Sequence, residues 1–294
     1  MKPPSFDYYD PTTIGEAINL LARYGTEARM LAGGQSLVPQ LNFRQSTPAV
    51  IVDLNRIPQL SYIRQQGGHL CFGAMTRQRQ IQFSDLVAHK IPLMIEATRF
   101  IGHLPTRTRG TIGGSLAHAD PGAEYPTLVT ALDGEMVVHG PSGERILKPR
   151  DFFRGPWSTA MRPDEILTEV RLPTVEDRSG WAFEELSLRE NHVAIVEVAA
   201  QLTVDQGGSC MAARLAVGGC VKPTRLRIVE EILEREGLGD RVLREAAVRA
   251  AELVDPINDF HASGAYRRRL TRVLVGRALT RATAMARRME KTDG

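Results

Sequence analysis

The sequence predicts a soluble protein of about two domains that mixes α-helices and β-strands. Its 294 residues exceed one average domain of about 150 residues. Apolar residues make up 43% of the chain and charged residues 24%, which is the balance of an ordinary globular protein. Short strand-like runs bounded by Gly and Pro recur along the chain, whereas about the last 70 residues are rich in Ala, Leu, Glu and Arg and favour helix.

Charge and hydropathy exclude several classes of function. The 37 basic and 34 acidic residues leave a net charge of +3, too small for a general nucleic-acid binder. No apolar stretch approaches the ~20 residues of a membrane span, and the longest, around His192–Ala200, is interrupted by Glu197. The chain starts MKPPSFD, without the apolar segment of a secretory signal, so we expect a cytoplasmic protein.

Cysteine and histidine usage gives no sign of a metal or redox centre on this chain. Cys71, Cys210 and Cys220 lack C-x-x-C spacing, and three thiols cannot supply the four ligands of an iron–sulfur cluster. We expect Cys71 and Cys220, which lie among apolar residues, to be small core side chains. His118 has no partner at metal-ligand spacing, so we expect it to have a structural hydrogen-bonding role.

Residues 1–55 predict a small βαβ-like unit. A helix is expected to begin after Thr13, because Thr13 and Glu16 fit a capping box in which each side chain satisfies a free backbone N–H. Gly25 is a suitable stop. Strands are expected on either side of this unit's first glycine pair, at Arg29–Ala32 and Ala49–Leu54.

Residues 56–175 predict a second region, a mixed sheet with helices. Turns at Gly67-Gly68 and at residues 141–143 favour two β-hairpins, and Glu165–Leu172 alternates like a strand and ends at Pro173. The helices expected in this region are Thr76–His89 and Ile91–His103.

Residues 176–294 predict a C-terminal region of antiparallel strands followed by helices. The polar segment Pro173–Gly180 is the best linker candidate, and strands at Val193–Val204 and Cys210–Val217 are expected to pair across a polar turn. Eight arginines make the last helix basic, which fits either a solvated face or a contact with a partner subunit. These are Arg267, Arg268, Arg269, Arg272, Arg277, Arg281, Arg287 and Arg288.

Two glycine pairs, each beside strand-like sequence, are candidates for a phosphate-binding site, with plain turns as the alternative. Glycine permits a positive φ and lets backbone N–H groups approach an anion, and neighbouring hydroxyls add donors. The chain contains neither G-x-G-x-x-G nor G-x-x-x-x-G-K-[ST], which excludes the Rossmann and P-loop interpretations. The first glycine loop comprises Leu31, Ala32, Gly33, Gly34, Gln35, Ser36 and Leu37, and the second comprises Thr111, Ile112, Gly113, Gly114 and Ser115.

The motifs around both loops resemble a known family. The chain reads A-G-G-x-S at Ala32–Ser36, R-x-R-G-T-I-G-G-S at Arg107–Ser115 and H-A-D-P at His118–Pro121, followed by Glu124. This order resembles the FAD-carrying medium subunits of the molybdenum hydroxylases, the family of xanthine dehydrogenase and aerobic carbon monoxide dehydrogenase. The resemblance covers essentially the whole chain.

The resemblance implies an α+β fold and one non-covalent FAD. Such subunits have a two-subdomain FAD-binding region of the vanillyl-alcohol-oxidase type, here residues 1–55 and 56–175. A C-terminal domain with a three-stranded antiparallel sheet and a helical bundle follows, here residues 176–294. The two glycine loops would hold the FAD diphosphate, and Asp120 and Glu124 would hydrogen-bond its ribose and ribityl hydroxyls. The resemblance implies no catalytic residue and no metal ligand on this chain.

The resemblance also implies partners. Substrate oxidation would occur at a molybdenum cofactor on a large subunit, and two 2Fe–2S clusters on a small subunit would pass electrons to the flavin. The assembly would be a dimer of heterotrimers. The segment Arg107–Asp120 is where we expect the iron–sulfur partner to dock, with local structure or phosphate binding as the alternative role of Arg107 and Arg109.

One position departs from the family pattern, and two other functions stay open. Many members have an Asp and then an aromatic residue, whose ring approaches the flavin, where this chain has His192 and Val193. The alternatives are a self-sufficient FAD-dependent oxidoreductase of the same fold and a non-catalytic nucleotide-binding scaffold. No further substrate-binding segment is evident in the sequence, which favours the electron-transfer subunit.

Overall fold

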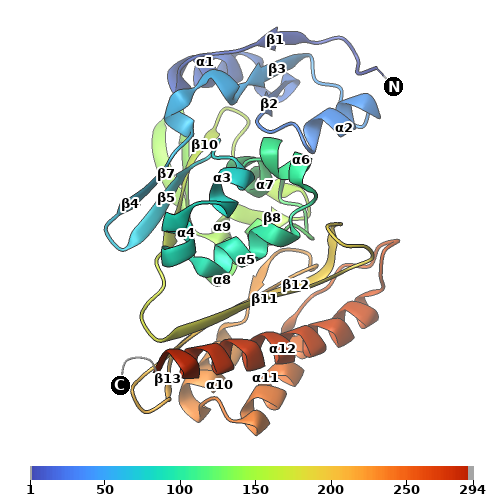
Figure 1. Ribbon diagram of the computed structural model, residues 1–294. Coiled ribbons are helices and arrows are strands. Elements are labelled where there is room, and N and C mark those ends of the chain that lie inside the picture. The colour runs from blue at the N-terminus through green and yellow to red at the C-terminus, as the bar shows by residue number, and fades with distance from the viewer. Residues whose placement is uncertain (1, 291–294) are drawn as a thin grey trace.

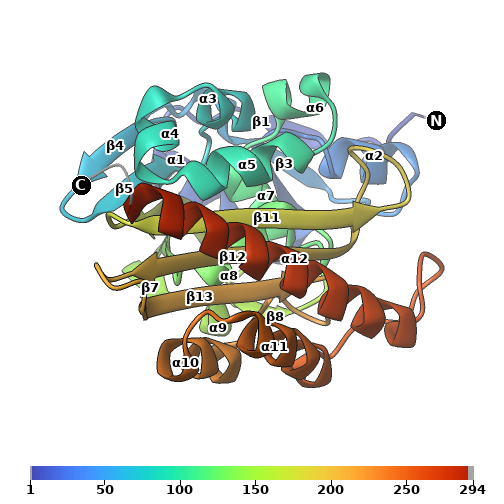
Figure 2. The ribbon, with the colours of Figure 1, turned by 60° about the horizontal axis from the view of Figure 1, so that its bottom comes forward.

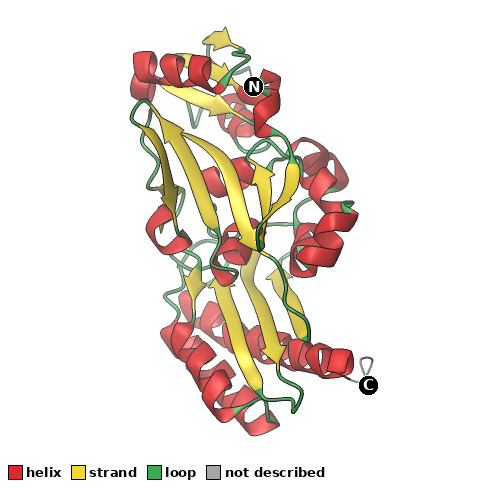
Figure 3. Cartoon of the chain, turned by 90° about the vertical axis from the view of Figure 1, so that its left-hand side faces the viewer, coloured by secondary structure: helices red, strands yellow, loops and turns green. Residues whose placement is uncertain are grey.

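The computed structural model describes residues 2–290, which form three stacked regions, each built around one sheet (Figure 1). The N-terminal sheet lies at one end, the central sheet in the middle and the C-terminal sheet with its long helices at the other end. The helices lie along the flanks of the sheets (Figure 3). Within residues 2–290, no helix combines the length and the apolar character needed to cross a membrane.

The N-terminal sheet is parallel, with the strand order β1-β3-β2, and has the βαβ connection expected from the sequence. Thr13 caps α1 by accepting a hydrogen bond from the Glu16 N–H (3.2 Å). The Glu16 carboxylate accepts from the N–H of Thr12 (2.8 Å) rather than from Thr13, so the cap reaches one residue further back than predicted. The elements are β1 (Asp7–Tyr9), α1 (Ile14–Tyr24), β2 (Ala28–Leu31), α2 (Leu37–Asn42) and β3 (Val50–Asp53).

The central sheet is antiparallel, with the order β4-β5-β10-β6-β7. Both hairpins predicted from glycine turns are present, as β4–β5 and β6–β7. Its strands are β4 (Ile63–Gln66), β5 (His69–Gly73), β6 (Glu135–Gly140), β7 (Gly143–Leu147) and β10 (Ile166–Pro173), and a separate small hairpin consists of β8 (Phe153–Gly155) and β9 (Ser158–Thr159).

Within the described residues the central region has seven helices, whereas the sequence predicts two. The single helix expected at Thr76–His89 is two helices, because the chain turns after Phe83 and the Ser84 hydroxyl caps the second by accepting from the Val87 N–H. The second glycine loop, expected as a loop, is the first turn of a helix. The helices are α3 (Gln78–Gln82), α4 (Asp85–Lys90), α5 (Pro92–Phe100), α6 (Leu104–Arg109), α7 (Ile112–His118), α8 (Glu124–Ala131) and α9 (Pro149–Phe152).

The C-terminal sheet has four strands within the described residues, one more than expected, in the order β11-β12-β13-β14. Helices α5 and α8 pack on one face, and α12 crosses the other face (Figure 2). Because both faces are covered, every residue of β12 is buried. The elements are β11 (Ser179–Ser187), β12 (Ala194–Val204), β13 (Cys210–Gly218), β14 (Thr224–Arg225), α10 (Arg227–Glu236), α11 (Asp240–Leu253) and α12 (Gly264–Glu290).

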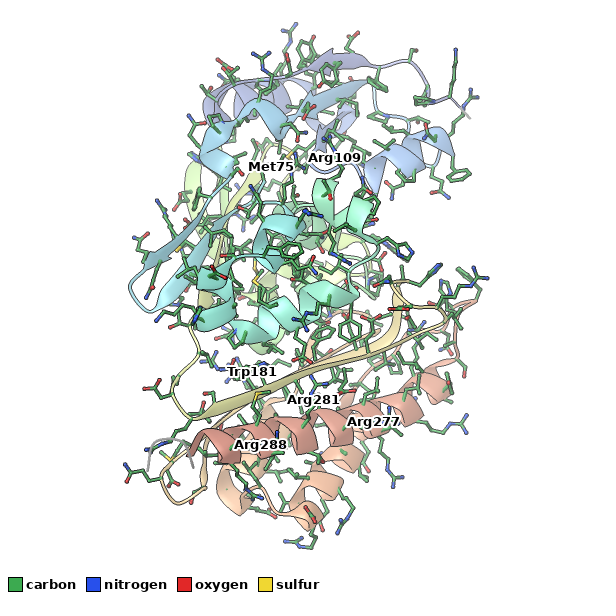
Figure 4. The ribbon with its side chains drawn as sticks, viewed as in Figure 1. Met75, Arg109, Trp181, Arg277, Arg281 and Arg288 are labelled. Carbon is green, nitrogen blue, oxygen red and sulfur yellow. The ribbon has the colours of Figure 1, made fainter. Side chains whose placement is uncertain are left out.

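The arginines of α12 do not form one uniform face. Arg267 is only 2% exposed, and its Nη2 donates to both carboxylate oxygens of Asp259, so the solvated-face interpretation is wrong for this residue. The other seven expected surface arginines are exposed. Among them, Arg281 pairs with Glu96 of α5 and with Glu184 of β11, and thereby ties α12 to the central region (Figure 4).

Candidate cofactor-binding cleft

A cleft of about 620 Å³ lies between the N-terminal and central regions and contains parts of both glycine loops. Figure 4 shows Met75, which lines this cleft, at the junction of the two regions. Leu31 and Ile112 do not line it: Leu31 ends β2, and Ile112 lies in the central core. The predicted residues that do line it are Ala32, Gly33, Gly34, Gln35, Ser36, Leu37, Thr111, Gly113, Gly114, Ser115, Asp120 and Glu124.

The first glycine loop follows β2 and leads into α2. Gly34 has a φ of +75°, a conformation that side chains with a Cβ rarely adopt. A Cβ on Gly33 would lie 2.8 Å from the Gly110 Cα, at the entrance to the second loop. The two loops therefore touch, and glycine at position 33 is required by their close approach.

The second glycine loop forms the N-terminal turn of α7. The Thr111 hydroxyl accepts a hydrogen bond from the Gly114 N–H (3.0 Å), so it serves as the helix cap. A Cβ on Gly113 would lie 2.7 Å from the carbonyl oxygen of Ala74. Gly113 therefore serves the packing of α7 against the segment after β5, in addition to lining the cleft.

A pair of side chains that the sequence analysis missed connects the two loops. The Asn55 amide donates to the Ala32 carbonyl (2.9 Å), and the Arg77 guanidinium donates to the Asn55 side chain and to the Arg109 carbonyl. Burial lowers the pKa of Arg77, and nearby Arg109 lowers it further. No motif signals these residues, because they reach the loops only through tertiary contacts.

The structure favours the local structural role for Arg107. Its guanidinium donates to the Gln82 side chain (3.0 Å) and to the carbonyls of Ile101 (2.8 Å) and Gly102 (2.6 Å). The Arg107 guanidinium is therefore hydrogen-bonded to groups of its own chain. Arg109, in contrast, is exposed at the entrance to the second loop.

Part of the cleft lies at the C-terminal end of α7. Trp157, Val193 and His118 line it there. Burial lowers the pKa of His118, which favours a neutral imidazole. Within the part of the chain that the structure describes, the His118 side chain makes no hydrogen bond, so the predicted structural hydrogen-bonding role of this side chain has no support among these residues.

A buried cluster of carboxyl groups adjoins this end of the cleft. Glu124 begins α8, while Glu185 and Glu197 are directly paired across β11 and β12. Thr127 donates to Glu197 Oε1 (2.6 Å), but Glu197 Oε2 and Glu185 Oε2 have no partner among the described residues. Burial raises the pKa of Glu185 to about 8. Burial also raises the pKa values of Glu124 and Glu197 well above the ordinary value, and repulsion from neighbouring acids adds to the effect for these two groups. The raised pKa of Glu124 favours its protonated form over the predicted carboxylate.

Replacing Glu197 with Gln is expected to stabilise the fold at alkaline pH. The folded state holds the Glu197 proton more tightly than the unfolded state. The protonated carboxyl therefore contributes fully to the free energy of unfolding at acidic pH, and this contribution is lost as pH rises through the folded-state pKa. The neighbouring acids are Asp120, Glu124 and Glu185. We expect the unfolding free energy of the variant at pH 9 to exceed that of the wild type by about 1–3 kcal/mol.

Urea unfolding of both proteins at pH 6 and pH 9 measures this difference. Exposed Glu190→Gln is the matched control and should leave the pH dependence unchanged. Equal pH dependence of wild type and E197Q would show that Glu197 ionises without cost in the folded chain.

Comparisons with known proteins cover nearly the whole chain. Residues 4–175 match the FAD binding domain in molybdopterin dehydrogenase, and residues 181–282 match the CO dehydrogenase flavoprotein C-terminal domain. The chain is 39% identical to the 6-hydroxypseudooxynicotine dehydrogenase complex subunit alpha of Paenarthrobacter nicotinovorans, over 98% of this chain and 97% of that protein. It is 35% identical to the carbon monoxide dehydrogenase medium chain of Hydrogenophaga pseudoflava, over 97% and 99%.

Comparison with solved structures points to the same family. A carbon monoxide dehydrogenase from Hydrogenophaga pseudoflava, lacking the Mo-pyranopterin moiety of its cofactor, superposes with a TM-score of 0.94 at 34% identity, covering 97% of this chain and 99% of that chain. Quinoline 2-oxidoreductase from Pseudomonas putida 86 gives 0.92 at the same identity and coverage. These matches confirm the family predicted from the glycine motifs. The chain belongs to the FAD-binding medium subunits of the molybdenum hydroxylases, the oxidoreductase family of xanthine dehydrogenase and aerobic carbon monoxide dehydrogenase.

Proposed function

We propose that this chain is the electron-transfer subunit that holds FAD in a molybdenum hydroxylase complex. It would receive electrons from two 2Fe–2S clusters of a small subunit and pass them to an external acceptor. Substrate oxidation would take place at the molybdenum cofactor of a large subunit. The observation that carries the proposal is the meeting of both glycine loops in one cleft of a chain that belongs to this family.

The residues of the cleft fit FAD. Its volume of about 620 Å³ lies within the roughly 300–1,000 Å³ of common cofactor sites. Among the described residues, the backbone N–H groups of the first loop, from Gly33 to Ser36, donate no hydrogen bond and are open to an anion, as a diphosphate requires. In the second loop the N–H groups of Gly113 and Gly114 already donate to the Ala74 carbonyl and the Thr111 hydroxyl, so this loop would contribute close backbone approach and the Ser115 hydroxyl. Gln78 is only 5% exposed and lines the cleft, and its Oε1 has no hydrogen-bond partner among residues 2–290, which leaves a buried polar atom for a ligand to satisfy.

The chain would bind and orient the cofactor rather than supply an acid, base or nucleophile. When bound, FAD supplies a ring that accepts and releases electrons one or two at a time. The two loops would hold the diphosphate, and Ser36 and Ser115 would add hydroxyl donors. Glu124, protonated in its buried setting, would donate a hydrogen bond where a carboxylate could only accept.

The proposed organisation has two FAD-binding subdomains of the vanillyl-alcohol-oxidase type, residues 1–55 and 56–175, and a C-terminal domain, residues 176–294. The position of the cleft between the N-terminal and central sheets supports the division of the first two. The proposed assembly is a dimer of heterotrimers with the large and small subunits.

The isolated chain is expected to bind about one equivalent of FAD and to contain no iron, sulfide or molybdenum. Denaturation should release the flavin, because the proposed contacts are hydrogen bonds and packing. Metal analysis, and flavin absorbance before and after denaturation, measure these outcomes.

The same preparation separates this proposal from the self-sufficient oxidoreductase. The substrate of the assembled complex should leave the flavin of the isolated chain oxidised, and adding back the other subunits should allow the substrate to bleach it. Bleaching without partners would overturn the proposal, and FAD retained on the denatured chain would overturn its non-covalent part.

A further inference from the structure

We propose that the indole of Trp157 stacks on the isoalloxazine ring of the bound FAD; this inference rests on the proposed function of the cleft. Trp157 lies in the turn between β8 and β9 and lines the cleft. Its side chain is 61% exposed although it is large and aromatic. Among residues 2–290 it is the single Phe, Tyr or Trp that lines the cleft.

The position of Trp157 fits a ring rather than a phosphate. Its backbone N–H donates to the carbonyl of Ala119 (2.8 Å), the residue that ends α7. The second glycine loop lies at the opposite end of this helix, roughly 10 Å away at 1.5 Å per residue. A diphosphate held at the loops would therefore place one of the two ring systems of FAD along α7 toward Trp157.

The polar groups beside Trp157 favour the isoalloxazine over the adenine. Asp120, Glu124 and His118 line the cleft near this end of α7 and offer both donors and acceptors to a ring edge that carries carbonyl and N–H groups. Val193, which also lines the cleft and is 53% exposed, cannot stack. Trp157 is therefore the side chain of the described cleft lining whose aromatic surface can stack on this ring.

The backbone of Trp157 is held in a costly conformation. Its φ is +53°, in the left-handed region that bulky residues rarely occupy. Asn191, which also lines the cleft, has a φ of +60°. Such strain clusters at ligand sites, where surrounding contacts fix the side chain. Here the Ala119 hydrogen bond fixes the turn and leaves the indole free at the cleft wall.

The test compares FAD and ADP binding by the flavin-stripped full-length chain and its variants. Trp157→Ala is expected to weaken FAD binding about tenfold, because it removes one aromatic stacking contact. It should also raise the fluorescence of the bound flavin, since a stacked indole quenches it. Trp157→Phe should restore part of the FAD affinity and part of the fluorescence quenching. ADP, which lacks the isoalloxazine, should bind all these proteins equally.

Trp181→Phe is the matched control. Trp181 is the other tryptophan of the chain; it lies in β11, packs against the central core and does not line the cleft (Figure 4). The Trp181→Phe substitution should leave the FAD affinity and the fluorescence of the bound flavin unchanged.

Two outcomes would overturn the inference, and a third would overturn the proposed function. Wild-type FAD affinity and flavin fluorescence in Trp157→Ala would show that the indole does not touch the ring. An equal loss of ADP binding would assign the indole to the adenine or to the general shape of the cleft. Failure of the wild-type chain to bind FAD would instead overturn the proposed function itself.

Discussion

Gly34→Val is expected to abolish FAD retention. Gly34 has a φ of +75°, and a Cβ there would meet the Val38 side chain at 3.2 Å. A β-branched residue cannot keep this conformation without a cost of about 1–3 kcal/mol, so the turn would shift and the N–H groups after it would no longer converge on a diphosphate. We expect FAD binding at least about 30-fold weaker and little flavin left after gel filtration.

Gly67→Val separates loss of the site from general backbone strain. Gly67 also has a positive φ, +57°, and has nothing within 4 Å of its added Cβ, but it lies in the β4–β5 turn and does not line the cleft. This control should lose comparable stability and keep its FAD. Full flavin content in Gly34→Val, or equal flavin loss in both variants, would show that the first loop does not hold the cofactor.

A glycine substitution in the second loop would not test cofactor binding alone, because its residues also have structural roles. The T-I-G-G-S motif predicts a phosphate loop, and hydroxyl and glycine chemistry explain that prediction. The structure gives Gly113 a packing role against Ala74 and gives Thr111 a capping role. Gly113→Val would thus disturb the fold as well as the site. The sequence identifies these residues as a group but cannot divide packing, capping and ligand contact among them.

Local signals predicted the elements that local chemistry determines. The Gly67-Gly68 turn gave the β4–β5 hairpin, and Thr13 gave the start of α1. Strand β11 was missed, because its core residues Ala182 and Phe183 are followed by Glu184 and Glu185, without the alternation of a half-buried strand. Strand β11 is stabilised by its contacts with β12 and α12. Both elements come later in the chain, so the residues of β11 alone do not reveal these contacts.

The parts of the site that depend on distant segments could not be predicted. Trp157 reaches the cleft from the β8–β9 turn, and Arg77 and Asn55 join the loops from two other segments. The protonated state of Glu124 requires the acidic residues that β11 and β12 place nearby. A motif gives the residue types of a site, whereas burial and charge depend on which segments meet.

Asp259→Ala is expected to destabilise the chain by about 3–5 kcal/mol, the cost of leaving a buried charge without its partner. Arg267 is 2% exposed, and its Nη2 bonds both carboxylate oxygens of Asp259 (2.8 and 2.7 Å). Its Nη1 donates to the Ile195 carbonyl at the start of β12. Burial opposes ionisation of Asp259, but hydrogen bonds from the Ala262 N–H and Arg267 outweigh it and lower the pKa of this carboxyl.

The ion pair joins the segment before α12 to Arg267 of α12, which in turn bonds Ile195 of the C-terminal sheet, so its removal should cost more stability than removal of a surface pair. Glu252→Ala is the control, because it breaks the exposed Arg249–Glu252 pair and should cost at most about 0.5 kcal/mol. Adding Arg267→Met to Asp259→Ala should restore much of the stability, since the double variant leaves no buried charge. Urea midpoints of the four proteins measure these differences. A loss in Asp259→Ala no greater than in Glu252→Ala would mean that water solvates the Arg267 guanidinium once its partner is removed.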